Sequence, residues 1–313
     1  MVYKPEYLCD LHCHTLLSDG NDTYKEIIDI ASKIGMKVIA LTDHDVTPLE
    51  TMVVDEKEIS TVEYGLLRNV HVIPGIEFSC DTYVDDVHII GLGCNFRLNT
   101  FKIEEENMKK SKINSYRKLT ELLTEHGINI SWGELLENEG NPRNPENIQR
   151  KHIFEQIARK GYTPTWQEAK IMVRDNPELN VKREKIDPLR AVEIIHESGG
   201  IAILAHPYLI DEIVEKDGVK LSRKEYIDKL IEFGLDGIEA AYTYSKTSYK
   251  GTLTQEQIEQ KVKSQYGKRV KIISGGSDYH NDAKKSVHHP RMLGEKGMSF
   301  EYFINNDYLK TLI

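Results

Sequence analysis

Short apolar runs recur along the chain and alternate with segments that have the periodicity of amphipathic helices. The runs have the length of buried strands, and polar residues follow most of them. Cap signals mark the segments between them and predict helices. This alternation predicts an α/β protein with a parallel sheet that is buried on both faces. We expect strands over residues 8–12, 38–41, 70–73, 87–90, 201–205, 237–240 and 270–274, and helices over 22–35, 187–199, 222–234 and 254–267, the first capped by Asn21 or Asp22.

The segment from about residue 98 to residue 186 breaks this alternation. Its apolar residues follow a helical period, and Ser131–Glu134 has the sequence of a capping box. Proline and asparagine predict a loop over 141–145. We therefore interpret 98–186 as a helical insertion in a domain formed by residues 1–97 and 187–313.

Composition narrows the class of protein. Apolar residues make up 39% of the 313-residue chain, as in folded soluble proteins, and no apolar run reaches the length of a membrane helix. A net charge of -9 argues against a broad nucleic-acid-binding surface. Four cysteines without zinc-site spacing, and no secretory signal, suggest reduced thiols and a cytoplasmic location. The sequence leaves the oligomeric state open.

Histidines and carboxylates gather at the ends of the predicted strands. His12 and His14 are two residues apart, so their side chains share one face of a strand and can chelate a metal ion. We place the other ligand-type residues at the carboxyl ends of parallel strands, where barrel enzymes build their sites. Those residues are Asp43, His44, Glu77, His88, His206, Asp278 and His280.

These motifs resemble, in order, those of the polymerase-and-histidinol-phosphatase (PHP) domain family: His12-Cys13-His14, Asp43-His44, His206-Pro207 and Asp278-Tyr279-His280. Ser18-Asp19-Gly20, residues 74–79 and 87–91 are similar to its stand-alone branch, which contains nucleoside 3′,5′-bisphosphate phosphatases and 5′-to-3′ exoribonucleases. The resemblance implies a distorted (β/α)7 barrel with a trinuclear metal centre, whose helical insertion covers the site.

The resemblance also implies a ligand set for two or three divalent metals. Glu77 would bridge two metals, and a hydroxide held by Glu77, Asp278 and His206 would attack the phosphate ester. Mixed imidazole and carboxylate ligands suit manganese, iron or zinc better than calcium. The three implied groups are His12, His14, Glu77 and Asp278; Glu77, His88 and His206; and Asp19, His44 and His280.

Residues outside the ligand set allow more than one interpretation. Three aspartates could orient imidazoles or stabilise turns: Asp10, Asp43 and Asp45. Glu239 could also orient an imidazole, or it could be solvated. Tyrosines 208, 242 and 244 could stack on a base or pack at the barrel rim. Cations of the insertion could bind substrate phosphates or lie on solvated helix faces. The candidate substrate-binding residues are Arg117, Arg143, Lys151 and His152, the last in a segment that has Arg-Lys-His where the family branch often has Arg-Pro-His.

These features predict a metal-dependent phosphoesterase. The leading hypothesis is hydrolysis of a phosphomonoester of a nucleotide or short oligonucleotide, of the nucleoside 3′,5′-bisphosphate type. A phosphodiesterase that acts on a cyclic phosphate is the nearest alternative. An amidohydrolase-like metal hydrolase would often use a carboxylated lysine where this chain has Glu77, and a non-catalytic metal-stabilised module would be expected to lack ligands.

Overall fold

Seven strands form the main sheet of the computed structural model, which describes residues 3–138, 141–216 and 218–313. The sheet curves into a nearly closed barrel, so the predicted barrel of the α/β class is confirmed. Its strands lie in the order β1-β2-β5-β6-β9-β12-β13. Their bounds are β1 Cys9–Cys13, β2 Val38–Leu41, β5 His71–Cys80, β6 Val87–Leu92, β9 Ile201–Leu204, β12 Gly237–Ala241 and β13 Ile272–Gly275.

The direction of β6 corrects the prediction of an all-parallel sheet. β6 runs antiparallel to both of its neighbours, β5 and β9. His88 is the second residue of β6, so it lies near the amino end of this strand and not near its carboxyl end. Because β6 is reversed, its amino end meets the edge of the sheet where its neighbours carry Glu77 and His206. Glu77 itself lies within β5, which continues to Cys80.

The barrel closes between β1 and β13 through a few bonds instead of a long ladder. Isolated bridges join Cys13 to Tyr279 and Cys9 to Met298. The buried carboxylate of Asp10 accepts hydrogen bonds from the backbone N–H of Ser277 at 2.9 Å and of Gly294 at 2.8 Å, and from the Ser277 hydroxyl. Asp10 therefore joins the first strand to the segment after the last one, and we call this closure the seam.

Helices pack around the barrel. The first helix is capped by Thr23, through a capping box with Glu26, and not by Asn21 or Asp22 as predicted. The capping boxes at Ser131, Ser222 and Thr254 and the Asp187 cap before Pro188 are confirmed. The helices of this first unit are α1 Tyr24–Ile34, α2 Thr61–Leu67, α7 Pro188–Glu197, α8 Arg223–Phe233, α9 Gln255–Tyr266 and α10 Phe300–Asn305, with short 3-10 turns at Tyr244–Lys246, Asp282–Lys285 and Leu309–Leu312.

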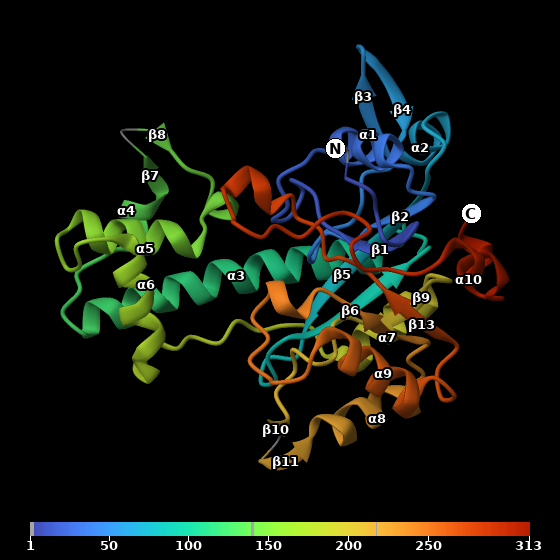
Figure 1. Ribbon diagram of the computed structural model, residues 1–313. Helices are drawn as coiled ribbons and strands as arrows, with labels where there is room; N and C mark the ends of the chain where they lie inside the picture. The colour runs from blue at the N-terminus through green and yellow to red at the C-terminus, as the bar shows by residue number, and fades with distance from the viewer. Residues whose placement is uncertain (1–2, 139–140, 217) are drawn as a thin grey trace. The chain divides into compact units, whose positions relative to one another are not determined.

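Two hairpins of the first unit were missed from the sequence. β3 (Thr51–Val54) pairs with β4 (Lys57–Ser60), and this hairpin lies beside α1 and α2 (Figure 1). β10 (Ile213–Lys216) pairs with β11 (Val219–Ser222), next to α8. Both hairpins are partly exposed, and alternate side chains of β3, Met52 and Val54, pack against the core. Their sequences therefore lack the continuous apolar runs by which we predicted the barrel strands.

Two compact units divide the chain. The first joins Met1–Glu105 to Ile186–Ile313, and the second is Glu106–Lys185. The second has its own core, built around Leu123, Ile153 and Phe154. A two-residue pairing, β7 (Glu137–Asn138) with β8 (Asn141–Pro142), interrupts its helices where we predicted a loop. Its remaining elements are most of α3 Asn99–Glu125, α4 Trp132–Leu136, α5 Arg150–Arg159 and α6 Trp166–Asp175, and 3-10 turns at Pro145–Asn147 and Pro177–Leu179.

The barrel core contains the apolar side chains that face inward from its strands. Leu11, Ile73, Ile90 and Ile203 are buried in one cluster there, and Phe303 of α10 packs into the same cluster. The four cysteines form no disulfide bonds in the structure. Over the described ranges, no helix combines the length and apolar character needed to cross a membrane.

Gly276, just after β13, permits the close approach of the seam strands. A Cβ atom at this position would lie 2.8 Å from the backbone nitrogen of His12 and closer still to its Cβ. We expect Gly276→Ala to reduce the free energy of unfolding by roughly 1–3 kcal/mol, because backbone atoms must move. Urea denaturation followed by circular dichroism measures this change. Gly133→Ala in α4 is the control, since its nearest neighbour would lie 3.8 Å away; equal stability of the two variants would contradict this account.

Candidate metal centre

The carboxylate of Glu77 lies at the centre of a ring of imidazoles. One oxygen, Oε2, lies 3.2 Å from Nε2 of His12, 3.2 Å from Nε2 of His14 and 3.1 Å from Nδ1 of His44. The other oxygen, Oε1, lies 2.9 Å from Nδ1 of His88 and 3.2 Å from Nε2 of His206. Glu77, His12 and His14 are fully buried. Both oxygens therefore face imidazole nitrogens that come from β1, β6 and the segments after β1, β2 and β9.

Asp278 forms a second carboxylate position beside this ring. Its Oδ1 atom lies 3.1 Å from Nε2 of His14, 3.6 Å from Nε2 of His12 and 3.3 Å from Nδ1 of His280. Asp278 and His280 follow β13, whereas His12 lies in β1 and His14 directly follows it. This arrangement brings ligand-type groups together across the seam.

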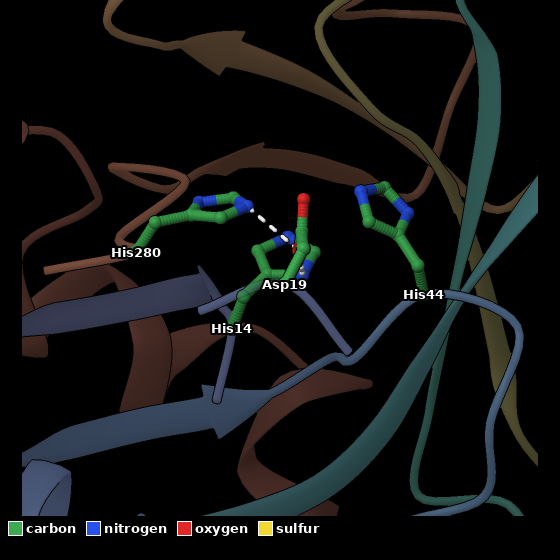
Figure 2. A group of neighbouring side chains, drawn as sticks. All are labelled: His14, Asp19, His44 and His280. Atoms are coloured by element: carbon green, nitrogen blue, oxygen red, sulfur yellow. Dashed lines mark hydrogen bonds and ion pairs between the residues drawn. The ribbon is translucent and has the colours of Figure 1, made fainter. Parts of the chain in front are cut away.

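Asp19 and His280 extend the cluster toward solvent. Nε2 of His280 lies 3.0 Å from Oδ1 of Asp19, and Nδ1 of His14 lies 3.7 Å from the same oxygen. Figure 2 shows His14, Asp19 and His280 side by side, with His44 on the other side of Asp19. The nine predicted ligand residues thus lie in one continuous cluster. Three overlapping groups in it could hold a metal ion: His14, Asp19, His44 and His280; His12, His14 and Glu77; and His44, Glu77 and His88.

Unsatisfied polar atoms test whether this cluster fits metal ions. Among the described residues, several buried side-chain atoms of the cluster make no hydrogen bond. Leaving such atoms without a partner is costly inside a protein, and a divalent cation would satisfy them. The donor set of imidazoles and carboxylates therefore fits metals such as manganese, iron or zinc. The unsatisfied atoms are Nε2 of His12, both ring nitrogens of His14, Nδ1 of His44, Oε2 of Glu77 and Nδ1 of His206.

The electrostatics of the cluster favour a cation. Burial raises the pKa of Glu77, but neighbouring imidazoles outweigh burial and hold it well below its usual range. Burial likewise raises the pKa of Asp278, but neighbouring imidazoles and the Arg291 guanidinium hold it well below its usual range. Burial lowers the pKa of His44 to about 4, so its ring is neutral and can donate a lone pair at neutral pH. Burial also lowers the pKa of His14, but the carboxylates of Asp278 and Glu77 outweigh it and raise this pKa to about 10. The position between these carboxylates thus attracts positive charge.

Other acidic residues support the cluster from behind. Glu239 is buried, with Oε1 3.3 Å from Nδ1 of His12, and its Oε2 accepts a hydrogen bond of 2.8 Å from the backbone N–H of His206. It therefore orients His12, and a solvated role for it is wrong. Asp43 accepts hydrogen bonds from Thr15 and Ser18, and Asp45 accepts one from the backbone of Ser79. These contacts of Asp43 and Asp45 hold backbone segments next to the cluster in place.

Two residues, Tyr242 and Arg291, hold Asp278 in place, a role that we did not predict for either of them. The buried hydroxyl of Tyr242 donates a hydrogen bond of 2.7 Å to Oδ2 of Asp278, and the guanidinium of Arg291 pairs with the same oxygen. Arg291 also pairs with Asp282 at 2.8 Å. With Oδ2 occupied, Asp278 presents Oδ1 to the histidines. Tyr242 directly follows β12, so the rule that sites form at strand ends could have identified it. Arg291 lies after a long loop, and in the sequence only its positive charge indicated that it could have a role in the site.

A cavity of about 290 Å³ opens over this cluster within the first unit. Ligand-type residues such as Glu77 and His206 form one part of its wall. Arg291 and Lys246 contribute cations to the wall, and Nζ of Lys246 pairs with Glu295 at 2.6 Å. The wall of the cavity thus contains both residues that could bind metals and two cations fixed by ion pairs, and this arrangement suits a phosphate group.

The four predicted substrate-binding residues lie in the second unit. The guanidinium of Arg117 lies 5.5 Å from the ring centre of Trp132, and Nζ of Lys151 lies 3.4 Å from a Glu155 oxygen. Arg143 donates to the carbonyl of Leu135 at 3.5 Å. His152 accepts a hydrogen bond of 3.0 Å from the Gln149 N–H in the capping box of α5. Each of the four side chains therefore already has a contact inside this unit, and binding of a substrate would have to coexist with that contact or replace it.

Comparison with known proteins places the chain in a family. Residues 10–163 match the PHP domain. A 5′-3′ exoribonuclease from Haemophilus influenzae is 30% identical over 207 residues, which cover 63% of this chain and 68% of that protein. The chain belongs to the PHP domain family. As a PHP protein with clustered histidines and carboxylates, it is a metal-dependent phosphoesterase.

Other relatives of this PHP protein differ in their named activities. A phosphoribosyl 1,2-cyclic phosphate 1,2-diphosphodiesterase from Eggerthella lenta is 24% identical over 284 residues, covering 89% of this chain and 96% of the relative. A 3′,5′-nucleoside bisphosphate phosphatase from Chromobacterium violaceum is 27% identical over 206 residues, covering 63% of this chain and 66% of the relative. The named substrates differ, so these similarities establish the family and not the substrate.

Solved structures share the PHP fold of this chain. A protein from Bifidobacterium adolescentis, named as a metal-dependent phosphoesterase, has a TM-score of 0.64 with 21% identity, and the match covers 96% of this chain and 95% of that one. A protein from Chromobacterium violaceum, named as an amidohydrolase and solved with sulfate bound, has a TM-score of 0.60 with 23% identity; the match covers 91% and 92%. At these identities the match establishes the fold alone.

Removing the central carboxylate tests the importance of Glu77. We expect Glu77→Ala to lower phosphoesterase activity by roughly 10³-fold, because charge stabilisation at the reacting phosphate is lost. Metal content measured by mass spectrometry should fall by at least one ion per chain, with little change in circular dichroism. Glu77→Gln keeps the shape and separates loss of charge from a packing defect, and Glu301→Ala on exposed α10 is the control. Wild-type activity in Glu77→Ala would exclude a central role.

Removing the Tyr242 hydroxyl tests the support of Asp278. Loss of an outer hydrogen bond to a ligand typically weakens metal affinity 10- to 100-fold, and we expect Tyr242→Phe to fall in this range. Competition with a fluorescent chelator measures the affinity. Tyr226→Phe removes a hydroxyl that donates instead to Asp81, and it should leave the affinity unchanged. Equal affinities for the two variants and the wild type would show that the hydroxyl does not act through the metal centre.

Proposed function

We propose that this PHP protein hydrolyses a phosphomonoester of a nucleotide or short oligonucleotide, with a nucleoside 3′,5′-bisphosphate as the type substrate. The observation that carries the proposal is the ring of five imidazoles around Glu77, open to a cavity with two cations. The cavity of about 290 Å³ suits one phosphate and the sugar atoms next to it. The named activity of the Chromobacterium violaceum relative supports this substrate class.

In this proposal the nine clustered residues are the metal ligands. His12, His14, Glu77 and Asp278 form one set, Glu77, His88 and His206 a second, and Asp19, His44 and His280 a third. When bound, two or three ions of manganese, iron or zinc supply positive charge for the phosphate oxygens and lower the pKa of a water molecule. Support comes from the distances around Glu77 and from the unsatisfied nitrogens of His12, His14 and His206.

The side chains of the protein have separate tasks in this reaction. Glu239 keeps the His12 ring oriented and also binds the backbone of His206. Tyr242 and Arg291 fix the Asp278 carboxylate through Oδ2, so that Oδ1 stays directed at the histidines of the cluster. Arg291 and Lys246 place positive charge on the cavity wall, which favours binding of a doubly charged phosphate monoester. We retain Arg117, Arg143, Lys151 and His152 as further candidates for substrate contact.

A cyclic phosphodiester is the second candidate substrate. One observation favours it: the similarity to the Eggerthella lenta cyclic phosphate diphosphodiesterase extends over 89% of this chain, whereas the similarity to the bisphosphate phosphatase covers 63%. The metal cluster would serve either reaction, because both begin with attack on a phosphorus atom whose oxygens must be neutralised. The two reactions differ in their products: hydrolysis of a monoester releases free phosphate, whereas opening of a cyclic diester leaves the phosphate attached to one sugar oxygen.

Product analysis separates the two candidates. We expect manganese-loaded protein to release phosphate and AMP from adenosine 3′,5′-bisphosphate, as measured by ion-exchange chromatography with a phosphate assay. The Glu77→Ala variant is the blank for contaminating phosphatases. Opening of a five-membered ribose cyclic phosphate, with the bisphosphate untouched, would instead establish the cyclic substrate. Activity on neither compound would overturn the proposed substrate classes.

A further inference from the structure

A second and larger cavity adjoins the metal centre inside the first unit. This groove has a volume of about 730 Å³, and it shares Asp86, Leu209 and Ser248 with the wall of the smaller cavity. Its walls come from the segment between β9 and α8, the segment between β12 and α9, and one face of α9. Segments that follow barrel strands at the site edge commonly bind the substrate. The groove therefore lies where a group attached to the reacting phosphate would extend.

Aromatic rings line the groove on the side of β9 and β12. The guanidinium of Arg223 lies 4.5 Å from the ring centre of Tyr208, and Tyr208 packs edge to face with Tyr244 at 6.4 Å. Tyr249 continues this row, 5.3 Å from Tyr244. Nε of Arg223 donates a hydrogen bond of 2.6 Å to the carbonyl of Ile210, which fixes the guanidinium against the ring. Such a wall suits the flat or apolar faces of a sugar or a nucleoside.

Cations with spare hydrogen-bonding capacity also line the groove. Among the described residues, the two terminal nitrogens of Arg223 make no hydrogen bond, and the ammonium groups of Lys250 and Lys261 make no ion pair. Lys224, the fourth cation, is paired with Asp228 at 2.6 Å. A guanidinium fixed by an aromatic ring, with free donors, is a typical element of a phosphate-binding site.

Four carboxylates balance these cations and limit what can bind. Asp85, Asp86, Asp211 and Glu212 lie on the same walls, so the groove has four acidic and four basic side chains and a formal charge near zero. A long polyanion such as RNA would be repelled along part of this surface. A small group with hydroxyls would instead donate hydrogen bonds to the carboxylates while its one phosphate meets the cations.

We propose that this groove binds the leaving group of the reaction, and that this group is a phosphorylated sugar or nucleoside whose own phosphate is held by Arg223 and Lys250. The inference rests on the proposed function, since it assumes that a phosphate ester reacts at the adjoining cluster. It predicts a preference for substrates with two phosphates, one at the metal centre and one in the groove. Both candidate substrates with a phosphorylated ribose fit this preference.

Binding of the leaving group tests this assignment without catalysis. Calorimetric titration of metal-loaded protein with AMP, and separately with ribose 5-phosphate, measures the affinity. We expect Lys250→Met and Arg223→Met each to weaken binding roughly tenfold or more, because a charge-assisted hydrogen bond is lost. Lys263→Met is the matched control: it lies on α9, pairs with Glu259 and is absent from the groove wall. Because Arg223 also supports the Ile210 loop, Lys250, which is exposed, gives the decisive result. Unchanged affinity in Lys250→Met would overturn the assignment.

Kinetics distinguish failure of this inference from failure of the proposed function. On adenosine 3′,5′-bisphosphate we expect Lys250→Met to raise KM roughly tenfold, with no such change on adenosine 3′-monophosphate, which lacks the second phosphate. Equal kinetic parameters for wild type and variant on the bisphosphate would exclude the groove and leave the proposed function intact. Lysine-dependent binding of AMP by a protein that hydrolyses neither candidate would support the groove and exclude the proposed reaction.

Discussion

A fully buried carboxylate surrounded by five imidazoles is the constraint on which the rest of this structure depends. Removing so many polar groups from water is costly, and hydrogen bonds among them satisfy only part of the demand. The barrel provides the means to assemble them: residues from β1, β5 and β6 and from the segments after β2, β9 and β13 meet at one edge of the sheet. The buried residues behind the cluster, such as Glu239 and Tyr242, then fix the side chains that a packed apolar core could not orient. The buried polar groups that the reaction needs thus lower the stability of the fold, and a bound cation would offset this cost by satisfying them.

Much of this arrangement could be predicted from the sequence, because strand and helix periods and cap residues act locally. The bounds of β2 and the capping boxes of α4, α8 and α9 follow from such local signals. The reversal of β6 could not be predicted, since a buried apolar strand has the same composition in either direction. His88 lies beside the other predicted ligands, but we had assigned it to the wrong end of its strand.

Supporting contacts were the hardest part of the site to predict. Glu239 has an ordinary sequence context, and only the fold places it behind His12. The same holds for the pair of Arg291 with Asp278, whose partner is set by the course of a long loop. The fold also assigns different tasks to strands and loops: strand ends carry the ligand-type residues, whereas the segments before α8 and α9 form the groove wall. If the groove binds the leaving group as proposed, substrate range could change through these segments without disturbance of the cluster.

The seam gives the barrel an unequal resistance to opening. Isolated bridges and the carboxylate of Asp10 join β1 to the segment after β13. Amide hydrogens at this closure therefore have less backbone protection than those between β5 and β6. His12 and His14 lie on one side of this seam, and Asp278 and His280 lie on the other. A metal ion held by residues from both sides would link them, and its binding free energy would add to the free energy needed to separate the two sides. Cofactor supply would then govern the lifetime of the folded barrel in the cell as well as its turnover.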